Sequence, residues 1–374
     1  MSAAYWRRAM NAGAAGVQVQ PPAPPPALRG PWAATHPGQR SWASRWAAAI
    51  HWRHVIVLAA VLLYPLVATP FFTFQIGGQA LALGLIALSL TFLAGYGGMV
   101  SLAQMTIAGM AGYLVAIFGT SVQQQISLGW PWWLVVILAI AIPTLMAAFI
   151  GWLSVRTAGI YTIMITLAFG VGFYYFCLQN YTIFNGFQGF HKVLPPTLLG
   201  IDWREAVPYY YLALFWALAG YFFVKYLLRT PFGLALQGVR DNERRMNALG
   251  YSVTAHRVAA YAVAGAMASV GGILLVWYNA LIAPGSVGTG ALLTILIIAV
   301  LGGMRHPIGA FLGAVVFVLL QNFAIDLLGT EYRERFNTVI GLAFLLIVAF
   351  SPDGLLGWWT QVRGRLRARP GRVG

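Results

Sequence analysis

The densest group of charged residues in this sequence is RDNERRMNALG, residues 240–250. Only 8% of the 374 residues are Asp, Glu, Lys or Arg. Surface guanidinium and carboxylate groups pair with charges on a partner and set the register and rate of association. On an amphipathic helix they also bind lipid headgroups. The segment therefore predicts docking or headgroup binding, and the sequence alone leaves both open. Its charged residues are Arg240, Asp241, Glu243, Arg244 and Arg245.

The carboxylates of the chain all fall in loops or at the ends of apolar stretches. A carboxylate at mid-membrane costs about 2.5–3.5 kcal/mol on insertion scales and normally marks a proton or ion route. The distribution therefore argues against a proton-driven pump or antiporter. It leaves open a sodium site built from backbone carbonyls and hydroxyls. The carboxylates are Asp202, Glu205, Asp241, Glu243, Asp326, Glu331, Glu334 and Asp353.

Cofactor and metal motifs do not occur in the sequence. There is no G-x-x-x-x-G-K-[ST] phosphate loop, so ATP hydrolysis through that motif is not expected of this chain. There is no H-E-x-x-H motif, and the six histidines fall in tails, loops or the ends of apolar stretches. The single cysteine, Cys177, lies in an apolar run and is predicted to be a buried, inert thiol. We therefore expect no cofactor or metal on this chain.

Two stretches carry hydroxyl and amide groups into apolar surroundings. In GYGGMVSLAQ (95–104), Ser101 and Gln104 follow glycines that permit a helix break or close helix packing. In GIYTIMITLAFG (159–170), Thr162, Thr166 and Gly170 recur every four residues and share one helix face, and Tyr161 and Phe169 lie on neighbouring faces. Such groups can line a path for a small polar solute. The alternatives are a tight turn in the first stretch and threonines bonded to their own helix backbone in the second.

A third stretch, FNGFQGF (184–190), combines two glycines with amides and aromatic rings. Asn185, Gly186 and Gly189 are candidates for the cap of an external cavity. The alternative is a glycine turn with aromatics at the membrane interface.

The elements that must position these groups are membrane helices. The chain is 60% hydrophobic, and residues 55–155 contain no Asp, Glu, Lys or Arg. Soluble domains carry about 25% charged residues. The apolar runs are continuous, whereas a membrane β-barrel would alternate in polarity. We predict an all-α, polytopic inner-membrane helical bundle of about ten spans, the eighth of them tilted, broken or re-entrant. The spans are 54–72, 77–96, 99–118, 132–151, 158–179, 208–228, 257–279, 290–303, 308–326 and 338–352.

Basic residues predict the orientation. With the N-terminus in the cytoplasm and ten spans, the C-terminus is cytoplasmic too, and the positive-inside rule is met. The net charge of +15 then reflects cytoplasmic tails and loops, so no nucleic-acid partner is expected. The predicted regions are a basic, Pro/Ala-rich and disordered tail (1–53), a membrane domain (54–357) and a basic tail (358–374). The lysines and arginines left outside are Lys192, Arg204, Arg333 and Arg335.

The charged segment falls in a cytoplasmic loop, residues 229–256. Its apolar residues recur at near-helical spacing, which predicts a short amphipathic helix with a narrow apolar face. Gly250 is a candidate C-terminal cap, and Thr254 is a candidate N-cap of the next helix. The apolar residues are Leu236, Val239, Met246 and Leu249.

The order of these motifs resembles the permease subunits of bacterial ABC importers for branched-chain amino acids, in particular the M-type of two paralogous permeases. GYGGMVSLAQ resembles that family's G-Y-x-G-x-V-S-L-x-H/Q element, and GIYTIMITLAFG its G-x-Y…T-L-A-F-G element. FNGFQGF, the segment 230–275, IAVLGGMRHPIGAFLGA (298–314) and FSPDGLLG (350–357) are similar to further family elements in the same order.

The resemblance implies a translocation path and a segment that couples it to ATP hydrolysis. The path would include Ser101, Gln104, Tyr161, Thr162, Thr166, Phe169, Asn185, Gly186 and Gly189. In the coupling loop, Glu243, Ala248 and Gly250 match the family signature. Arg240, Asp241, Arg244 and Arg245 would steer docking, and Met246 and Leu249 would supply the buried anchor.

The implied partners are a paralogous permease, two ATP-binding cassette ATPase subunits that bind ATP-Mg, a periplasmic solute-binding protein and the lipid bilayer. Alternatives stay open, because MRHPIG (304–309) departs from the family's glycine-serine turn and Gln104 stands where many relatives carry His. They are a permease for urea, short amides or another small solute, a sugar-type ABC permease, and a stand-alone secondary transporter or channel. A membrane-embedded enzyme would need a catalytic set at membrane depth, and the sequence offers none.

Overall fold

The computed structural model describes residues 52–121, 126–157, 159–197, 200 and 202–328, together with 341, 354, 355 and 357. These residues fall into two units divided after Leu62. The first unit contributes the start of helix α3 (Trp52–Val67). The second unit begins at Leu63 and contains every residue of the predicted path and coupling loop. The predicted tails and the tenth predicted span, 338–352, lie outside the described residues apart from 52, 53 and 341.

The described part of the second unit is built of helices and one short ribbon, as the all-α prediction requires. The strands β1 (Phe190–His191) and β2 (Leu281–Ile282) pair antiparallel, with Phe190 opposite Ile282. The helices are η3 (Phe72–Gly78), α4 (Gln79–Thr91), η4 (Phe92–Tyr96), α5 (Gln104–Phe118), α6 (Trp132–Ser154), α7 (Ile160–Gln179), α8 (Tyr181–Phe184), η5 (Gly186–Gln188), α9 (Ala206–Leu227), α10 (Pro231–Asp241), α11 (Glu243–Ala248), α12 (Val253–Asn279), η6 (Pro284–Val287), α13 (Thr289–Gly302) and α14 (Pro307–Leu328).

Five of these helical stretches are long and apolar enough to cross a membrane: Phe72–Tyr96, α6, α7, α9 and α12. Helices α13 and α14 form a pair bent by 116°, which makes a sixth crossing if it is one broken span. Helix α5 has only 15 residues, short of the roughly 20 that a span needs. The described residues therefore contain five or six candidate crossings, and the prediction of about ten is not confirmed. The eighth predicted span, 290–303, is α13, the short arm of the bent pair.

The centre of the bundle is the helix Phe72–Tyr96 with α12 packed along it. In their most apolar windows, 83% of residues of Phe72–Tyr96 are buried, against 28% of α7. Adjacent glycines let α12 approach two neighbours, because Gly271 lies against Ile86 of α4 and Gly272 against the backbone of Ala108 in α5. Small residues at such crossings allow the close van der Waals packing that holds membrane helices together.

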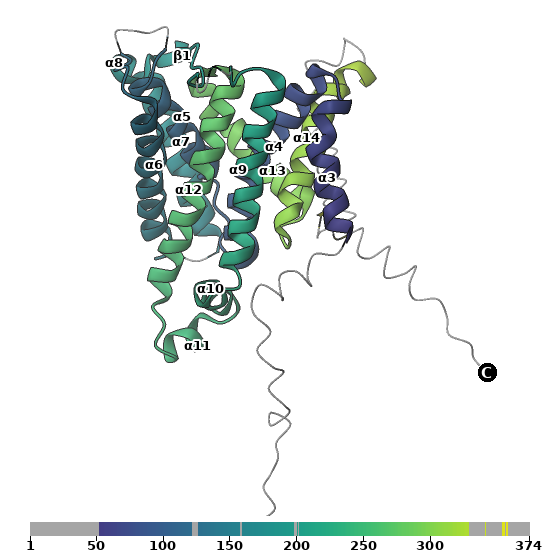
Figure 1. Cartoon of the computed structure of the whole chain (residues 1–374). Coiled ribbons are helices and arrows are strands. Elements are labelled where there is room, and N and C mark those ends of the chain that lie inside the picture. Colours follow the sequence, from purple (N-terminus) through teal and green to yellow (C-terminus); the bar gives the residue numbers. More distant parts are fainter. Residues whose placement is uncertain are drawn as a thin grey trace, which may run out of the picture. The chain divides into compact units, whose positions relative to one another are not determined.

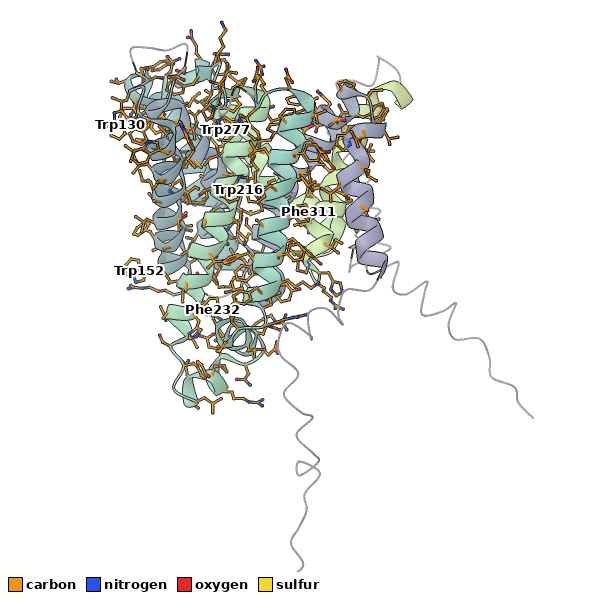
Figure 2. The ribbon with its side chains drawn as sticks, viewed as in Figure 1. Trp130, Trp152, Trp216, Phe232, Trp277 and Phe311 are labelled. Carbon is orange, nitrogen blue, oxygen red and sulfur yellow. The ribbon has the colours of Figure 1, made fainter. Side chains whose placement is uncertain are left out.

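The two ends of the bundle differ in character. Helices α10 and α11 lie beyond the lower ends of α9 and α12 in Figure 1, whereas α8 and β1 lie at the upper end. We call these the α10 end and the sheet end. Trp130 and Trp277 lie near the sheet end, and Trp152 and Phe232 near the α10 end (Figure 2). Aromatic residues at both ends of a helical bundle are typical of a protein that spans a bilayer.

Candidate functional site

The first predicted polar stretch is a break between two helices. The helix Phe72–Tyr96 ends in a π-helical turn, and α5 starts only at Gln104. Gly98 has a left-handed backbone (φ +67°), and the N–H of Met99 turns back to the carbonyl of Leu93 at 3.1 Å. The predicted helix break is confirmed, and Ser101 and Gln104 are both buried beside it.

Hydrogen bonds tie this break to α7 and back to α4, which belongs to the helix that leads into it. The N–H of Leu102 donates to Thr166 Oγ1 of α7 at 3.1 Å. The side-chain amide of Gln104 lies 3.0 Å from the hydroxyl of Ser89 in α4. The hydroxyl of Tyr261 in α12 is directed at that of Ser101 without a hydrogen bond of ordinary geometry. An irregular segment inside a membrane must satisfy its backbone within the protein, and the bond to Thr166 does so for the N–H of Leu102.

Helix α7 presents the predicted face to this break. Thr162, Thr166 and Gly170 are all buried on it, and Gly170 allows contact with Leu292 of α13. Thr166 also donates to its own helix at the Ile163 carbonyl, 3.0 Å away.

The two aromatic candidates of α7 lie elsewhere. Tyr161 is 65% exposed on the outer side of the helix. Phe169 is half-buried and packs against the core from its edge. The structure therefore brings Ser101, Gln104 and Thr166 together and leaves Tyr161 apart from them.

The glycine-rich stretch 184–190 lies at the sheet end. Asn185 and Gly186 are both left-handed, and Asn185 Nδ2 donates to the Gly189 carbonyl at 2.6 Å. Gly189 passes so close to the backbone of Ile282 and Ala283 that a side chain would not fit. These residues fold the turn onto β2. They are remote from Gln104, since the Tyr113 ring that packs on Phe184 lies nine residues along α5, or about 14 Å.

A small cavity of about 20 Å³, room for about one water, lies at the sheet end between α5, α12 and β2. Its polar lining residues, Asn279 and Ser286, were not predicted from the sequence. Both lie at helix ends or turns, where polar residues carry little signal. The predicted path residues do not line it.

The charged segment forms two helices, and the prediction of a single amphipathic helix is wrong. Helix α10 ends at Asp241 and α11 starts at Glu243, because Asn242 adopts an extended backbone (φ −158°, ψ 97°). The side chain of Asn242 accepts a hydrogen bond from the N–H of Arg245 at 3.0 Å and so caps α11. An asparagine that caps one helix necessarily ends the continuity of the one before it.

The caps at the far side of α11 confirm one prediction and correct another. Gly250 is left-handed (φ +87°), and its N–H donates to the Asn247 carbonyl at 3.0 Å. The N–H of Tyr251 donates to the Met246 carbonyl at 3.1 Å, which completes a Schellman motif. The predicted N-cap Thr254 is wrong, since Ser252 accepts from the N–H of Ala255.

The apolar face of the segment is largely used within the chain. Met246 is buried with Ala235, Val239 and Val253 in a small separate core. Leu249, in contrast, is 66% exposed. Of the two residues expected to anchor a partner, only Leu249 is free of the small core. Glu243, Arg244, Arg245, Ala248 and Gly250 are exposed as well.

Three charged residues of the predicted coupling loop make contacts inside the chain. Arg240 pairs with Asp241 at 2.8 Å, and its Nη1 donates to the carbonyl of Gly95, in the last turn of the helix Phe72–Tyr96, at 2.6 Å. Glu243 pairs with Arg257 at the start of α12 at 3.0 Å. Sequence reasoning missed Gly95 and Arg257 as members of this site, because both lie outside the charged run.

Thr166→Val is expected to lower the stability of the chain by about 1–3 kcal/mol, the cost of leaving a buried N–H without its acceptor. Valine has nearly the same shape, so packing is preserved and the N–H of Leu102 alone loses its partner. The thermal midpoint of the detergent-purified chain measures the effect. Thr166→Ser retains the hydroxyl and should stay near the native value. An unchanged midpoint in Thr166→Val would show that the break does not depend on this bond.

Comparison with known proteins gives one consistent group. The family model described as "Branched-chain amino acid transport system / permease component" matches residues 72–349. The permease protein LivM of the high-affinity branched-chain amino acid transport system of Salmonella typhimurium is 26% identical over 319 residues, or 78% of this chain and 70% of that protein. LivM of Escherichia coli K12 is 27% identical over 239 residues, with 57% and 55% covered. LivH of the same strain is 26% identical over 295 residues, with 73% and 90% covered. No solved structure is significantly similar to the chain.

Proposed function

Because the chain belongs to the permease components of branched-chain amino acid transport systems, we propose that it is the M-type permease subunit of an ATP-driven importer. It is a multi-pass membrane protein and a transport component rather than an enzyme. Its cargo would be branched-chain or related small amino acids. The two LivM relatives, which are named as permeases of branched-chain amino acid transport systems, support this substrate class.

The proposed setting is the bacterial inner membrane, with both termini and the α10 end in the cytoplasm. Counting α3, α5, α13, α14 and the apolar stretch 338–352 as crossings gives about ten spans. The basic residues of α10 and α11 support this orientation under the positive-inside rule.

The observation that carries the proposal is the exposed surface of α11 and the residues after it. Helix α11 lies beyond the lower ends of the long helices (Figure 1). Three charged residues and one apolar residue on it or directly after it are exposed: Glu243, Arg244, Arg245 and Leu249. A charged rim around one apolar residue has the composition of a protein docking site. The sequence has no phosphate loop, so ATP-Mg would be bound by two ATPase subunits, one of them docked at this surface.

The proposed path lies between this chain and the paralogous permease. Tyr161 and Phe169 would form part of its wall, since they sit on the less buried side of α7. Ser101, Gln104, Thr162 and Thr166 would join the path when the break moves. An apolar wall with a few hydroxyls suits a small zwitterion with an apolar side chain. Asn185, Gly186 and Gly189 would lie near the outer mouth, where the solute-binding protein delivers its ligand.

Affinity purification of the tagged chain in mild detergent, followed by uptake in vesicles, tests the proposal. Two ATPase subunits, a second permease and ATP-dependent uptake of leucine, isoleucine or valine are the expected result, with the purified solute-binding protein supplied. Uptake of urea or short amides in place of these amino acids would overturn the substrate class. Purification of the chain alone, with uptake independent of ATP, would overturn the importer.

A further inference from the structure

Four residues at the end of the helix Phe72–Tyr96 and directly after it, Gly95 to Gly98, are held from two sides. From α10, Arg240 donates through Nη1 to the Gly95 carbonyl at 2.6 Å, and its side-chain stem covers Gly98. From the bend between α13 and α14, the Arg305 carbonyl accepts a hydrogen bond from the Tyr96 hydroxyl at 3.0 Å. The end of this helix is therefore joined to α10 by Arg240, through both a polar and a packing contact, and by the buried side chain of Leu236, which lies close to Gly97.

The chemistry of a helix end explains why an arginine sits here. The last four carbonyls of a helix have no partner within it, and the negative end of the helix dipole attracts a cation. Gly95 lies in the last turn of the helix Phe72–Tyr96. Asp241 accepts from Nε of Arg240 at 2.9 Å and from Nη2 at 2.8 Å, which fixes the guanidinium and leaves Nη1 for the Gly95 carbonyl.

Helices α10 and α11 are built to move together. Met246 of α11 is buried with Ala235 and Val239 of α10, and it packs directly on Gly238. A force applied to the exposed surface of α11 therefore reaches α10 through a packed core. From α10 it reaches the Gly95 carbonyl through the hydrogen bond of Arg240, while Leu236 packs beside it at Gly97.

We propose that Arg240 is a positioning residue that transmits the movement of α10 and α11 to the end of the helix Phe72–Tyr96, rather than a charge that docks a partner. This inference rests on the proposed importer function. It assigns different tasks to two neighbouring groups of charges. Arg244 and Arg245 face outward for the ATPase, and Arg240 with Asp241 faces the chain's own break.

Removing Arg240 should leave the fold intact. The side chain of Arg240 is 37% exposed, so water can reach the Gly95 carbonyl at this helix end. The variant then loses the polar contact between α10 and the Gly95 carbonyl, and keeps the Leu236 packing at Gly97, without leaving a buried polar group unpaired. This separates a transmitting role from a merely stabilising one.

Reconstituted complexes of Arg240→Ala, Arg240→Lys and the native chain test the proposal, with solute uptake and ATP hydrolysis measured on the same vesicles. The expected result for Arg240→Ala is uptake reduced at least tenfold, ATP hydrolysis within about twofold of native, and unchanged co-purification of the ATPase. Arg240→Lys, which keeps a cation within reach of the carbonyl, should recover part of the uptake. Arg156→Ala removes an arginine that stacks on Trp152 and serves as the matched control.

A second pair of variants tests the same contact from its partner. Asp241→Asn keeps an acceptor for the guanidinium and should retain most of the uptake per ATP hydrolysed. Asp241→Ala should lower that ratio as Arg240→Ala does. Native uptake per ATP in both alanine variants would overturn the proposal, as would loss of the ATPase from the Arg240→Ala complex, which would make Arg240 a docking residue. If the native chain itself shows no ATP-dependent uptake, the importer function fails, whatever the variants do.

Discussion

Gly272→Ala is expected to prevent most of the protein molecules from reaching the folded state. A methyl group at this position would overlap the carbonyl oxygen, the carbonyl carbon and the Cα of Ala108, where α12 crosses α5. Backbone atoms cannot rotate away, so the two helices would have to separate along a central contact of the bundle. Overpacking of this kind costs typically 1–3 kcal/mol, and a clash with backbone belongs at about 3 kcal/mol or above.

A matched glycine shows whether the effect is local. Gly172 also lies inside a long helix, α7, and a methyl group there would meet nothing within 4 Å. Since alanine has the higher helix propensity by about 1 kcal/mol, Gly172→Ala should match or exceed native stability. The yield of monodisperse protein in detergent and its thermal midpoint measure both variants. Equal yields and equal thermal midpoints for Gly272→Ala and Gly172→Ala would mean that α5 and α12 do not cross in close backbone contact.

Leu249→Asp is expected to abolish ATP-driven uptake, with at least a tenfold loss and little change in the stability of the chain itself. Leu249 is 66% exposed, so its side chain adds little to the packing of the isolated chain. A carboxylate in its place would be buried without a partner in an ATPase cleft, and burying an unpaired charge is costly. The ATPase subunits should be lost when the tagged chain is purified.

Leu249→Met is the conservative control, because methionine preserves apolar contact while changing shape. It should retain the ATPase and more than half of the uptake. The thermal midpoint of the chain alone should be the same in both variants. If Leu249→Asp shows native uptake, Leu249 is not part of the docking surface. The proposed docking surface would then lose its main support.

Sequence patterns predicted the parts of this fold that depend on local chemistry. A run of glycines ahead of Ser101 predicted the break, because glycine tolerates the left-handed backbone that Gly98 adopts. A spacing of four residues predicted that Thr162, Thr166 and Gly170 share one helix face, and that face is buried. Gly250 predicted the end of α11 for the same reason as Gly98.

Patterns did not predict features that depend on distant partners. Asn242 divides α10 from α11, and Met246 folds back on Gly238, a tertiary contact that the near-helical spacing of apolar residues does not reveal. The inward contact of Arg240 depends on Gly95, which lies 145 positions earlier in the chain. The short apolar run 290–303 predicted a tilted, broken or re-entrant span, but length and composition alone did not give the 116° bend between α13 and α14.

The ribbon β1–β2 determines how α7 and α12 can move against each other. It joins the chain after α7 to the chain after α12, and it is the only strand pairing among the described residues. The two helices are thus fastened at the sheet end, which makes a tilt about that end easier than a slide. Helix α12 has 27 residues and is about 40 Å long, so a tilt of about 5° would displace its far end by about 3.5 Å. With a pivot at the sheet end, the largest displacement would fall at the end that carries Arg257 and its bond to Glu243 of α11.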